Sequence, residues 1–208
     1  MKDFTLAIPR ALLAWLGLTW AVGADTLAAI ESPTAVVRST ITEVIRILED
    51  KELKVPDRLK ARRQLLESVI ASHFDYEEMS KRTLATHWKP LNETERREFV
   101  ELFKAFLSDR YAAKIEGYSG EQVLYLSERL SDGYAEVRTK LVSSKLEVPM
   151  DYRLIARDGS WYAYDVIVDG VSLVKNYRSQ FTNIIADSSF QELMRRLRER
   201  TADEKAKA

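Results

Sequence analysis

Two aspartates are the residues in this sequence best placed to do chemistry. Asp165 and Asp169 lie four positions apart where β-branched and aromatic residues predict a strand, so both carboxylates fall on one face. A carboxylate buried in an apolar pocket can become basic enough to abstract a proton from a small molecule. Alternatively, Asp165 binds a backbone N–H group or an arginine, and Asp169 shapes the turn at Asp169-Gly170. The sequence favours this structural role and leaves the enzymatic one open.

Other catalytic residue types are scarce or poorly spaced. The chain has two histidines, His73 and His87, and neither is spaced from a second ligand as a zinc site requires. There is no cysteine, which excludes a thiol nucleophile, a disulfide framework and a lipid-modified cysteine anchor. Ser172 does not lie in a nucleophile elbow. We therefore expect a protein that is not an enzyme, with no catalytic residue, no metal and no cofactor.

The first 24 residues have the layout of a secretory signal peptide. Lys2 and Arg10 give a basic start, residues 11–22 are apolar, and Val22-Gly23-Ala24 supplies small residues for cleavage. We expect residues 25–200 to form a single exported domain and residues 201–208, which are charged and small, to be disordered. With 32 basic and 32 acidic residues, the chain is near neutral, which argues against nucleic acid as its main partner.

Helical periodicity and capping signals predict a helical first half. A basic cluster in the second helix, Arg58, Lys60, Arg62 and Arg63, is either a solvated face or a docking patch, and the sequence favours the solvated face. The predicted helix starts are Ser32-Pro33, Asp57, Phe74 and Asn92, where Glu95 completes a capping box.

Residues after Gly120 alternate between apolar and polar, which predicts an antiparallel sheet. Asp132-Gly133 and Asp158-Gly159 are hairpin turn signals, and each strand has one face for the core and one for water. A helix follows from Val171, and Ser188 with Gln191 predicts the cap of a last helix. The fold class is therefore α+β, with helices on one face of a four-stranded sheet. The predicted strands are Gln122–Leu130, Tyr134–Ser143, Leu146–Arg157 and Trp161–Val168.

The helix that begins at Asn92 has an unusually aromatic inner side. Phe99, Phe103, Phe106, Leu107 and Tyr111 recur on it at helical spacing. An ordinary aromatic core explains this pattern, and from the residues alone it is the preferred explanation. A wall of phenylalanine also lines cavities for apolar ligands, so a cavity remains the alternative.

Several segments resemble the MlaC family, whose members are also known as toluene-tolerance periplasmic proteins. The resemblance covers nearly all of the chain after the leader, and one departure is Leu84-Ala85, where the family usually has Leu-Gly. The segments that carry it are Phe74–Met79, Trp88, the aromatic helix, Val148–Arg153, Trp161–Leu173 and Asn176–Phe181.

The resemblance implies a periplasmic phospholipid carrier. Such a protein exchanges lipid between an outer-membrane lipoprotein–porin complex and an inner-membrane ABC transporter with its periplasmic lipid-binding domain, and so maintains outer-membrane lipid asymmetry. The implied fold is a helical layer against a strongly curved antiparallel sheet, with the acyl chains of a diacyl phospholipid held in an apolar cavity between them. The alternatives are a small-molecule enzyme that uses Asp165 or Asp169, and a carrier of lipoprotein acyl chains.

The resemblance and the residue patterns together predict two sets of site residues. The first set docks partners through charges at Arg138, Lys140, Arg153 and Arg178. The second set lines the lipid cavity and comprises Phe99, Phe103, Phe106, Leu107, Tyr111, Val137, Leu141, Val148, Met150, Tyr152, Val166, Val168, Tyr177 and Phe181.

Overall fold

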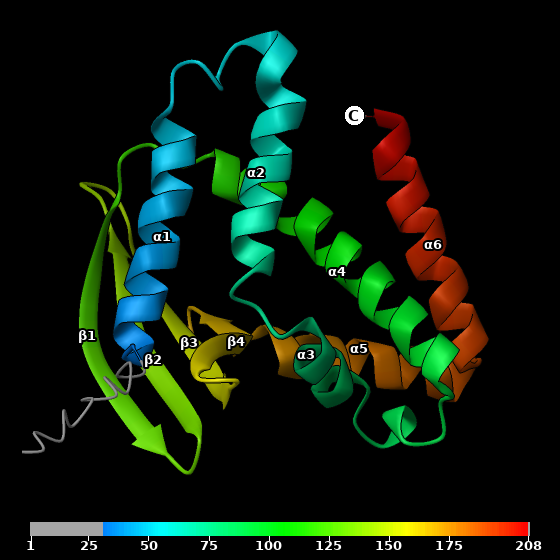
Figure 1. The fold of residues 1–208 in the computed structure, drawn as a ribbon. Coiled ribbons are helices and arrows are strands. Elements are labelled where there is room, and N and C mark those ends of the chain that lie inside the picture. Colours follow the sequence, from blue (N-terminus) through cyan, green and yellow to red (C-terminus); the bar gives the residue numbers. More distant parts are fainter. Residues whose placement is uncertain (1–30, 208) are drawn as a thin grey trace, which may run out of the picture.

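The structure, a computed structural model, describes residues 31–207, with side chains up to residue 202. The predicted signal peptide, residues 1–24, lies outside these residues. The helices precede and follow one sheet, as expected (Figure 1). The elements are α1 (Pro33–Glu49), the 3-10 helix η1 (Pro56–Arg58), α2 (Leu59–Ala71), α3 (Tyr76–Leu84), the 3-10 helix η2 (Ala85–Trp88), α4 (Glu93–Glu116), β1 (Gln122–Ser131), β2 (Tyr134–Val142), β3 (Glu147–Arg157), β4 (Ser160–Val168), β5 (Val171–Ser172), α5 (Leu173–Asp187) and α6 (Phe190–Lys207).

Two helices, α1 and α4, begin after their predicted capping residues, whereas α2 begins at Leu59 without a side-chain cap and α3 is capped by Asp75. The hydroxyl of Ser32 accepts the N–H of Ala35 at 3.1 Å, and Asn92 forms the expected capping box with Glu95. These side chains satisfy N–H groups that have no partner within the helix. The predicted cap of the last helix is wrong by one residue, because Ser188 ends α5 and Ser189 accepts the N–H of Glu192 at 3.1 Å.

The sheet is an antiparallel meander in the order β1-β2-β3-β4-β5, with five strands where four were predicted. The additional strand arises at Asp169-Gly170. Both residues have positive φ, 50° and 77°, as in the two-residue hairpin turns at Asp132-Gly133 and Asp158-Gly159. The chain therefore turns back and pairs Val171 with Val168 before the helix begins. For this reason α5 starts at Leu173 and not at the predicted Val171.

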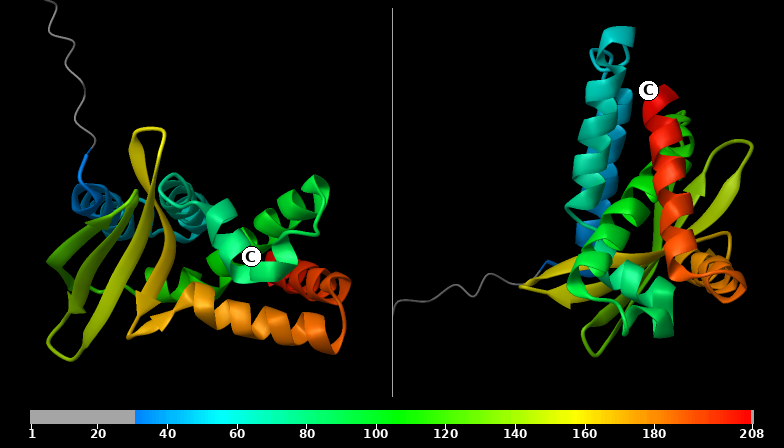
Figure 2. Two further views of the ribbon diagram at one scale, coloured as in Figure 1. Left: turned by 90° about the horizontal axis from the view of Figure 1, so that it is seen from below. Right: turned by 90° about the vertical axis from the view of Figure 1, so that its right-hand side faces the viewer.

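Among the described residues, two apolar cores lie at opposite ends of the molecule, and a smaller cluster of Ile47, Leu48 and Leu66 joins α1 to α2. Val36 and Val37 of α1 pack against the sheet residues Val137, Leu154 and Ala163. The second core is formed by α3, α4, α5 and α6. Figure 2 shows the sheet with α1 at one end of the molecule and α5 with α6 at the other. This separation leaves α2 and the second half of α4 to close the space between the two cores.

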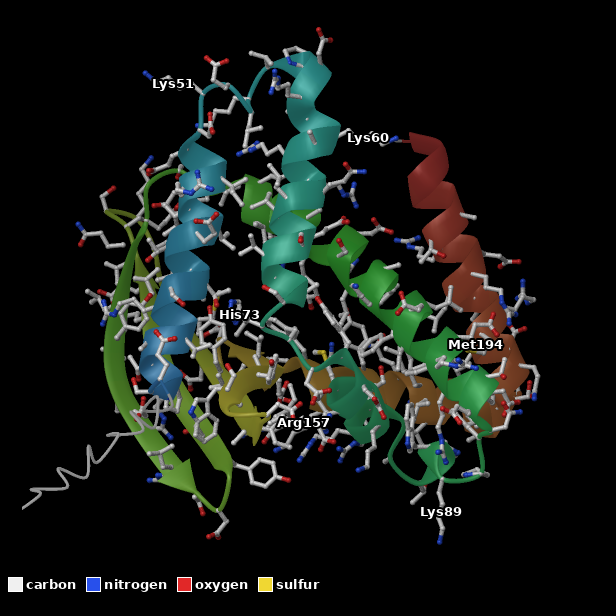
Figure 3. The ribbon with its side chains drawn as sticks, viewed as in Figure 1. Lys51, Lys60, His73, Lys89, Arg157 and Met194 are labelled. Atoms are coloured by element: carbon white, nitrogen blue, oxygen red, sulfur yellow. The ribbon has the colours of Figure 1, made fainter. Side chains whose placement is uncertain are left out.

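The segment between α2 and α3 is joined to the sheet. The N–H of Asp75 donates to the carbonyl of Ala163 at 2.9 Å, and the N–H of Ala163 donates to the carbonyl of His73 at 2.8 Å. At the end of β3, Arg157 forms ion pairs with Asp75 at 2.9 Å and with Glu78 at 3.3 Å (Figure 3). The chain is thereby fixed to β4 where it leaves α2.

Two further expectations differ from the structure. Where a disordered tail was expected, residues 201–207 continue α6, and Thr201 is buried with its hydroxyl bonded to the carbonyl of Leu197. Arg62, expected to face solvent, is buried and donates to the carbonyl of Leu48 at 3.1 Å. A cation at the end of α1 satisfies a carbonyl that has no helical partner.

Candidate functional site

A cavity of about 1070 Å³ lies between the inner face of the sheet and the helices α1, α2 and α4. It is larger than the roughly 300–1,000 Å³ of most small-molecule sites. Most of its lining is apolar. The apolar lining includes residues of α1 (Ile41, Val44, Ile45, Leu48), α2 (Leu66, Ile70), α4 (Leu107, Tyr111, Ile115) and the sheet (Val123, Leu141, Met150, Tyr152, Val166, Val168).

Strand register places the sheet residues of this lining side by side. Met150 pairs with Thr139 on one side and with Val168 on the other. Tyr152 pairs with Val166 two positions further along. Because alternate residues of a strand point to the same face, these side chains form one continuous wall. The alternation in the sequence therefore predicts which strand residues share the inner face, of which part lines the cavity.

The structure places half of the predicted lipid contacts at the cavity. They come from the second half of α4 and from β2, β3 and β4. The predicted residues that line the cavity are Leu107, Tyr111, Leu141, Met150, Tyr152, Val166 and Val168.

No metal-ligand cluster of three or more His, Cys, Asp or Glu residues occurs within residues 31–202.

The other half lies outside the lining. Phe99 and Phe103 have no exposed surface and pack with Tyr177 and Phe181 in the core between α4, α5 and α6. The ring of Phe103 lies 5.5 Å from both Tyr177 and Phe181, edge to face. Such contacts stabilise a closed core. These four residues are therefore core and not cavity wall.

The remaining three each have a different neighbour. Phe106 packs edge to face on Tyr177 at 5.4 Å, at the border of the same core. Val137 is fully buried under α1. Val148 shares the face of Leu141, its register partner, but does not belong to the lining. Helical spacing shows that one side of α4 is buried, but it does not show whether α5 or a cavity covers that side.

Sequence reasoning missed the contribution of α1. The stripe Ile41, Val44 and Leu48 is apolar at helical spacing, and it lines the cavity opposite the sheet. The same stripe begins with Val37, which packs on the sheet. A helix that touches the sheet at one end and faces the cavity at the other is consistent with a sheet that curves away from it. The apolar stripe is visible in the sequence, but its spacing is the same whether the helix faces a cavity or a closed core.

Charged residues join α2 to α4 at the border of the cavity. Arg63 forms ion pairs with Glu67, at 3.2 Å, and with Asp109 on α4. The hydroxyl of Ser108 donates to Glu67 at 2.6 Å. These residues belong to the lining but come from helices only. The cavity thus has an apolar wall on the sheet side and a polar border on the helix side.

Tyr76, the first residue of α3, also lines the cavity beside these charged residues. Burial, and to a smaller extent the carboxylate of Glu67, raises the pKa of Tyr76 to about 12. The ammonium of Lys104 lies 5.6 Å from the centre of the Tyr76 ring, a cation–π distance. Tyr76 therefore remains a neutral phenol at physiological pH.

The two aspartates do not form a catalytic pair. Asp165 is 1% exposed and accepts hydrogen bonds from the hydroxyl of Ser172 at 2.6 Å, the N–H of Val174 at 3.0 Å and Arg153 at 3.2 Å. A carboxylate in this position satisfies the start of α5 and fixes it to β4. Asp169 lies in the hairpin turn, and neither residue lines the cavity. The geometry matches the structural alternative.

The four charged residues predicted to dock partners differ in their contacts within the protein. Arg153 pairs with Asp165, and Arg178 donates to the carbonyl of Arg82 at 2.8 Å. Arg138 and Lys140 form ion pairs on the outer face of the sheet, with Glu136 at 2.9 Å and Glu147 at 2.8 Å. Such exposed pairs exchange readily with water or with a partner's charges.

Among the residues that the structure describes, no helix is long and apolar enough to cross a membrane. The sequence profile of the family "MlaC protein" matches residues 38–199. A curated relative is the intermembrane phospholipid transport system binding protein MlaC of Haemophilus influenzae, 18% identical over 180 residues, which cover 84% of each chain. Another is the toluene tolerance protein ttg2D of Pseudomonas putida, 25% identical over 158 residues and 74% of each chain.

A solved structure has the same fold. It is a phospholipid-binding protein from Ralstonia solanacearum in complex with a phospholipid, with a TM-score of 0.75 and 23% sequence identity. The match covers 83% of this chain and 98% of that one. At this identity the likeness establishes the α+β architecture.

Proposed function

Because this chain belongs to the MlaC family, we propose that it is a periplasmic carrier of diacyl phospholipid that holds the acyl chains in the cavity between the sheet and α1, α2 and α4. The observation that supports this most directly is the size and apolar lining of the cavity, about 1070 Å³. The relatives are a phospholipid transport binding protein and a toluene tolerance protein. Export by the predicted signal peptide, residues 1–24, is part of the proposal.

The physical problem for such a carrier is the cost of moving acyl chains through water. Burial stabilises about 0.8 kcal/mol per methylene, so two chains of about fifteen carbons involve on the order of 20 kcal/mol or more. If the cavity is as apolar as a bilayer, the acyl chains have nearly the same free energy in the membrane and in the carrier, so little free energy is needed to transfer them. No covalent chemistry is needed, and binding alone accounts for the activity.

The polar border fits the rest of the lipid. Phosphate and headgroup carry charge and remain hydrated, because burying an unpaired charge is costly. They would lie near the helix side of the cavity, where Arg63, Lys104 and Lys114 are found. The acyl chains would lie against the sheet residues Met150, Tyr152 and Val166.

We include in the proposal that the carrier delivers lipid between an outer-membrane lipoprotein–porin complex and an inner-membrane ABC transporter complex. Delivery requires the carrier to leave each partner, so its contacts should be transient and partly electrostatic. Arg138 and Lys140 are the best candidates for these contacts, since their only ion pairs in the described chain are exposed.

The test is to purify the exported protein from periplasm without detergent, extract it with organic solvent and identify the lipids by mass spectrometry. Diacyl phospholipid in near-stoichiometric amount is expected. Met150→Asp should fold but contain little lipid, because a charge in the cavity wall can be hydrated only when the cavity is empty. Leu130→Asp, at a residue that is 58% exposed and outside the lining, should keep its lipid.

Three outcomes would count against the proposal. Wild-type protein that contains no lipid and takes none up from vesicles would exclude a carrier of this class. Extraction of lipoprotein acyl chains in place of phospholipid would favour the alternative cargo. A Met150→Asp protein that is unfolded would place Met150 in a closed core.

A further inference from the structure

The hydroxyl of Tyr152 is a polar group within the otherwise apolar sheet wall of the cavity. Tyr152 lines the cavity on β3, two residues from Met150. Within the described part of the chain, the one hydrogen bond of this hydroxyl is to the sulfur of Met150, at 3.0 Å. A thioether is among the weakest acceptors that a protein offers. The hydroxyl is therefore held in place but poorly satisfied.

The side chains paired with Tyr152 across the sheet offer it no acceptor. Its register partners on the inner face are Val137 on β2 and Val166 on β4. The nearby hydroxyl of Thr139 donates to the carbonyl of Met150, and among the described residues the Tyr152 hydroxyl donates to the Met150 sulfur and not to Thr139. Tyr152 is half-buried, and its hydroxyl gains when an oxygen acceptor that enters the cavity replaces the weak contact with sulfur.

The environment also fixes the protonation state of this phenol. Burial, and to a smaller extent the neighbouring phenol of Tyr125, raises the pKa of Tyr152 above its ordinary value. Tyr152 is thus neutral at physiological pH and always carries its proton. It is available as a hydrogen-bond donor in the empty protein and in the loaded one.

We propose that the Tyr152 hydroxyl leaves the Met150 sulfur when lipid enters and donates to an acyl ester carbonyl of the bound diacyl phospholipid. This inference rests on the proposed function and adds to it the feature of the lipid that the cavity recognises. Tyr152 is a specificity-determining residue in this scheme, and the thioether of Met150 is the acceptor that holds the hydroxyl while the cavity is empty.

The ester carbonyl is the phospholipid group that fits this position. A phosphate carries charge, and the register partners of Tyr152 on the inner face, Val137 and Val166, provide no cation to balance it. An alkyl chain provides no acceptor. An ester carbonyl is neutral, accepts strongly, and lies where the acyl chains meet the glycerol. A hydrogen bond there also fixes how deep the chains enter the cavity.

The experiment compares two lipids that differ only in this carbonyl. Delipidated protein is incubated with vesicles that contain equal amounts of diacyl phosphatidylcholine and its dialkyl ether analogue of the same chain length, and the bound lipids are quantified by mass spectrometry. The wild type should retain the ester lipid over the ether lipid by about two- to tenfold, the range of one neutral hydrogen bond. Tyr152→Phe should bind both lipids with a ratio near one.

Two further variants distinguish the effect of the Tyr152 hydroxyl on the ester-to-ether ratio from the effect of any other change near the cavity wall. Met150→Leu removes the competing sulfur and should keep or increase the preference for the ester. Tyr125→Phe removes a partly buried phenol that is outside the lining and should leave the ratio at its wild-type value.

Each outcome has a distinct meaning. Equal retention of both lipids by the wild type overturns the inference, whatever the variants do, and leaves the proposed function intact. A preference that persists in Tyr152→Phe also overturns it. Failure of the wild type to take up either lipid removes the proposed function together with this inference.

Discussion

Arg63 on α2 and Asp109 on α4 form an ion pair across the border of the cavity. Glu67 and Ser108, on the same two helices, form a second link at 2.6 Å. Meanwhile Leu66 of α2 packs against Ile47 and Leu48 of α1. We therefore expect that these polar links can open while the apolar contact between α2 and α1 is kept. We expect the two links to control how readily lipid enters and leaves.

The first prediction concerns this control. Arg63→Gln removes the cation that holds Glu67 and Asp109, both of which remain partly exposed to solvent. The exchange of a fluorescent phospholipid with vesicles should become about two- to fivefold faster, because such a pair contributes at most about 1 kcal/mol. The free energy of unfolding should change by less than about 1 kcal/mol. Arg46→Gln, which breaks an exposed pair with Glu43 outside the lining, is the matched control and should not alter exchange.

The second prediction separates the core from the cavity wall with the same substitution at two sites. Leu154 is 1% exposed and packs under α1, so Leu154→Ala should cost about 2–5 kcal/mol of stability. Leu141 lines the cavity and is partly exposed, so Leu141→Ala should cost less than about 1.5 kcal/mol but reduce lipid retention. Urea unfolding of the delipidated proteins and lipid extraction give the two readouts. Equal losses of stability would show that Leu141 belongs to a closed core.

The third prediction concerns a strained alanine. Ala85 follows α3 with φ 50° and ψ −117°, a conformation that favours glycine. Ala85→Gly removes strain of about 1–3 kcal/mol and adds flexibility to the unfolded chain worth about 0.4–1 kcal/mol. The net result should be a stabilisation of about 1 kcal/mol in denaturant unfolding. Ala113→Gly in α4 should have the opposite sign, because there glycine loosens a helix.

The fourth prediction concerns Asp165. Its carboxylate accepts from Ser172, Val174 and Arg153, so Asp165→Asn loses charge-assisted bonds and should destabilise the protein by about 2–3 kcal/mol. Asp169→Asn should change stability by less than about 0.5 kcal/mol, since asparagine tolerates the positive φ of this turn. Both folded proteins should still bind phospholipid. Loss of lipid by folded Asp169→Asn would give this carboxylate a role beyond the turn.

The fifth prediction tests electrostatic docking. Replacing Arg138 and Lys140 together by glutamate should slow association with the periplasmic domain of the inner-membrane complex and weaken its dependence on salt. The lipid content of the variant should not change, since neither residue lines the cavity. Lys89→Glu, on the exposed loop before α4 (Figure 3), is the control for a general change of charge. Association rates that do not vary with salt in the wild type would remove the electrostatic part of the proposal.

How much of this structure the sequence could predict depends on whether a signal was local. The capping box at Asn92 and the turn at Asp158-Gly159 are local, and both were predicted correctly. Met150 and Tyr152 were placed in the cavity because strand alternation sorts residues by face. Asp169-Gly170 has the same sequence as the other two hairpin turns, yet the helical spacing beyond it concealed the short strand Val171–Ser172.

The aromatic side of α4 shows what periodicity could not decide. Phe103 and Leu107 are one helical turn apart, and both are buried. Both belong to the same core as Tyr177, but only Leu107 also lines the cavity. The difference depends on where α5 and α6 dock, which is a contact between segments some seventy or more residues apart in the chain. No pattern within α4 contains that information.

The short backbone pairing of His73–Asp75 with β4 bears on self-association of the protein through its sheet edges. A sheet exposes unpaired backbone groups at its two edges, and these invite strand addition and aggregation. At the β4 edge, Val171–Ser172 occupies one end and Phe74 bridges to Ala163 at the other. The opposite edge, β1, has an irregular register between Tyr125 and Ser127, and such bulges hinder regular pairing. Each edge thus carries a feature that hinders strand addition, which is the chain's own segments at β4 and an irregular backbone at β1.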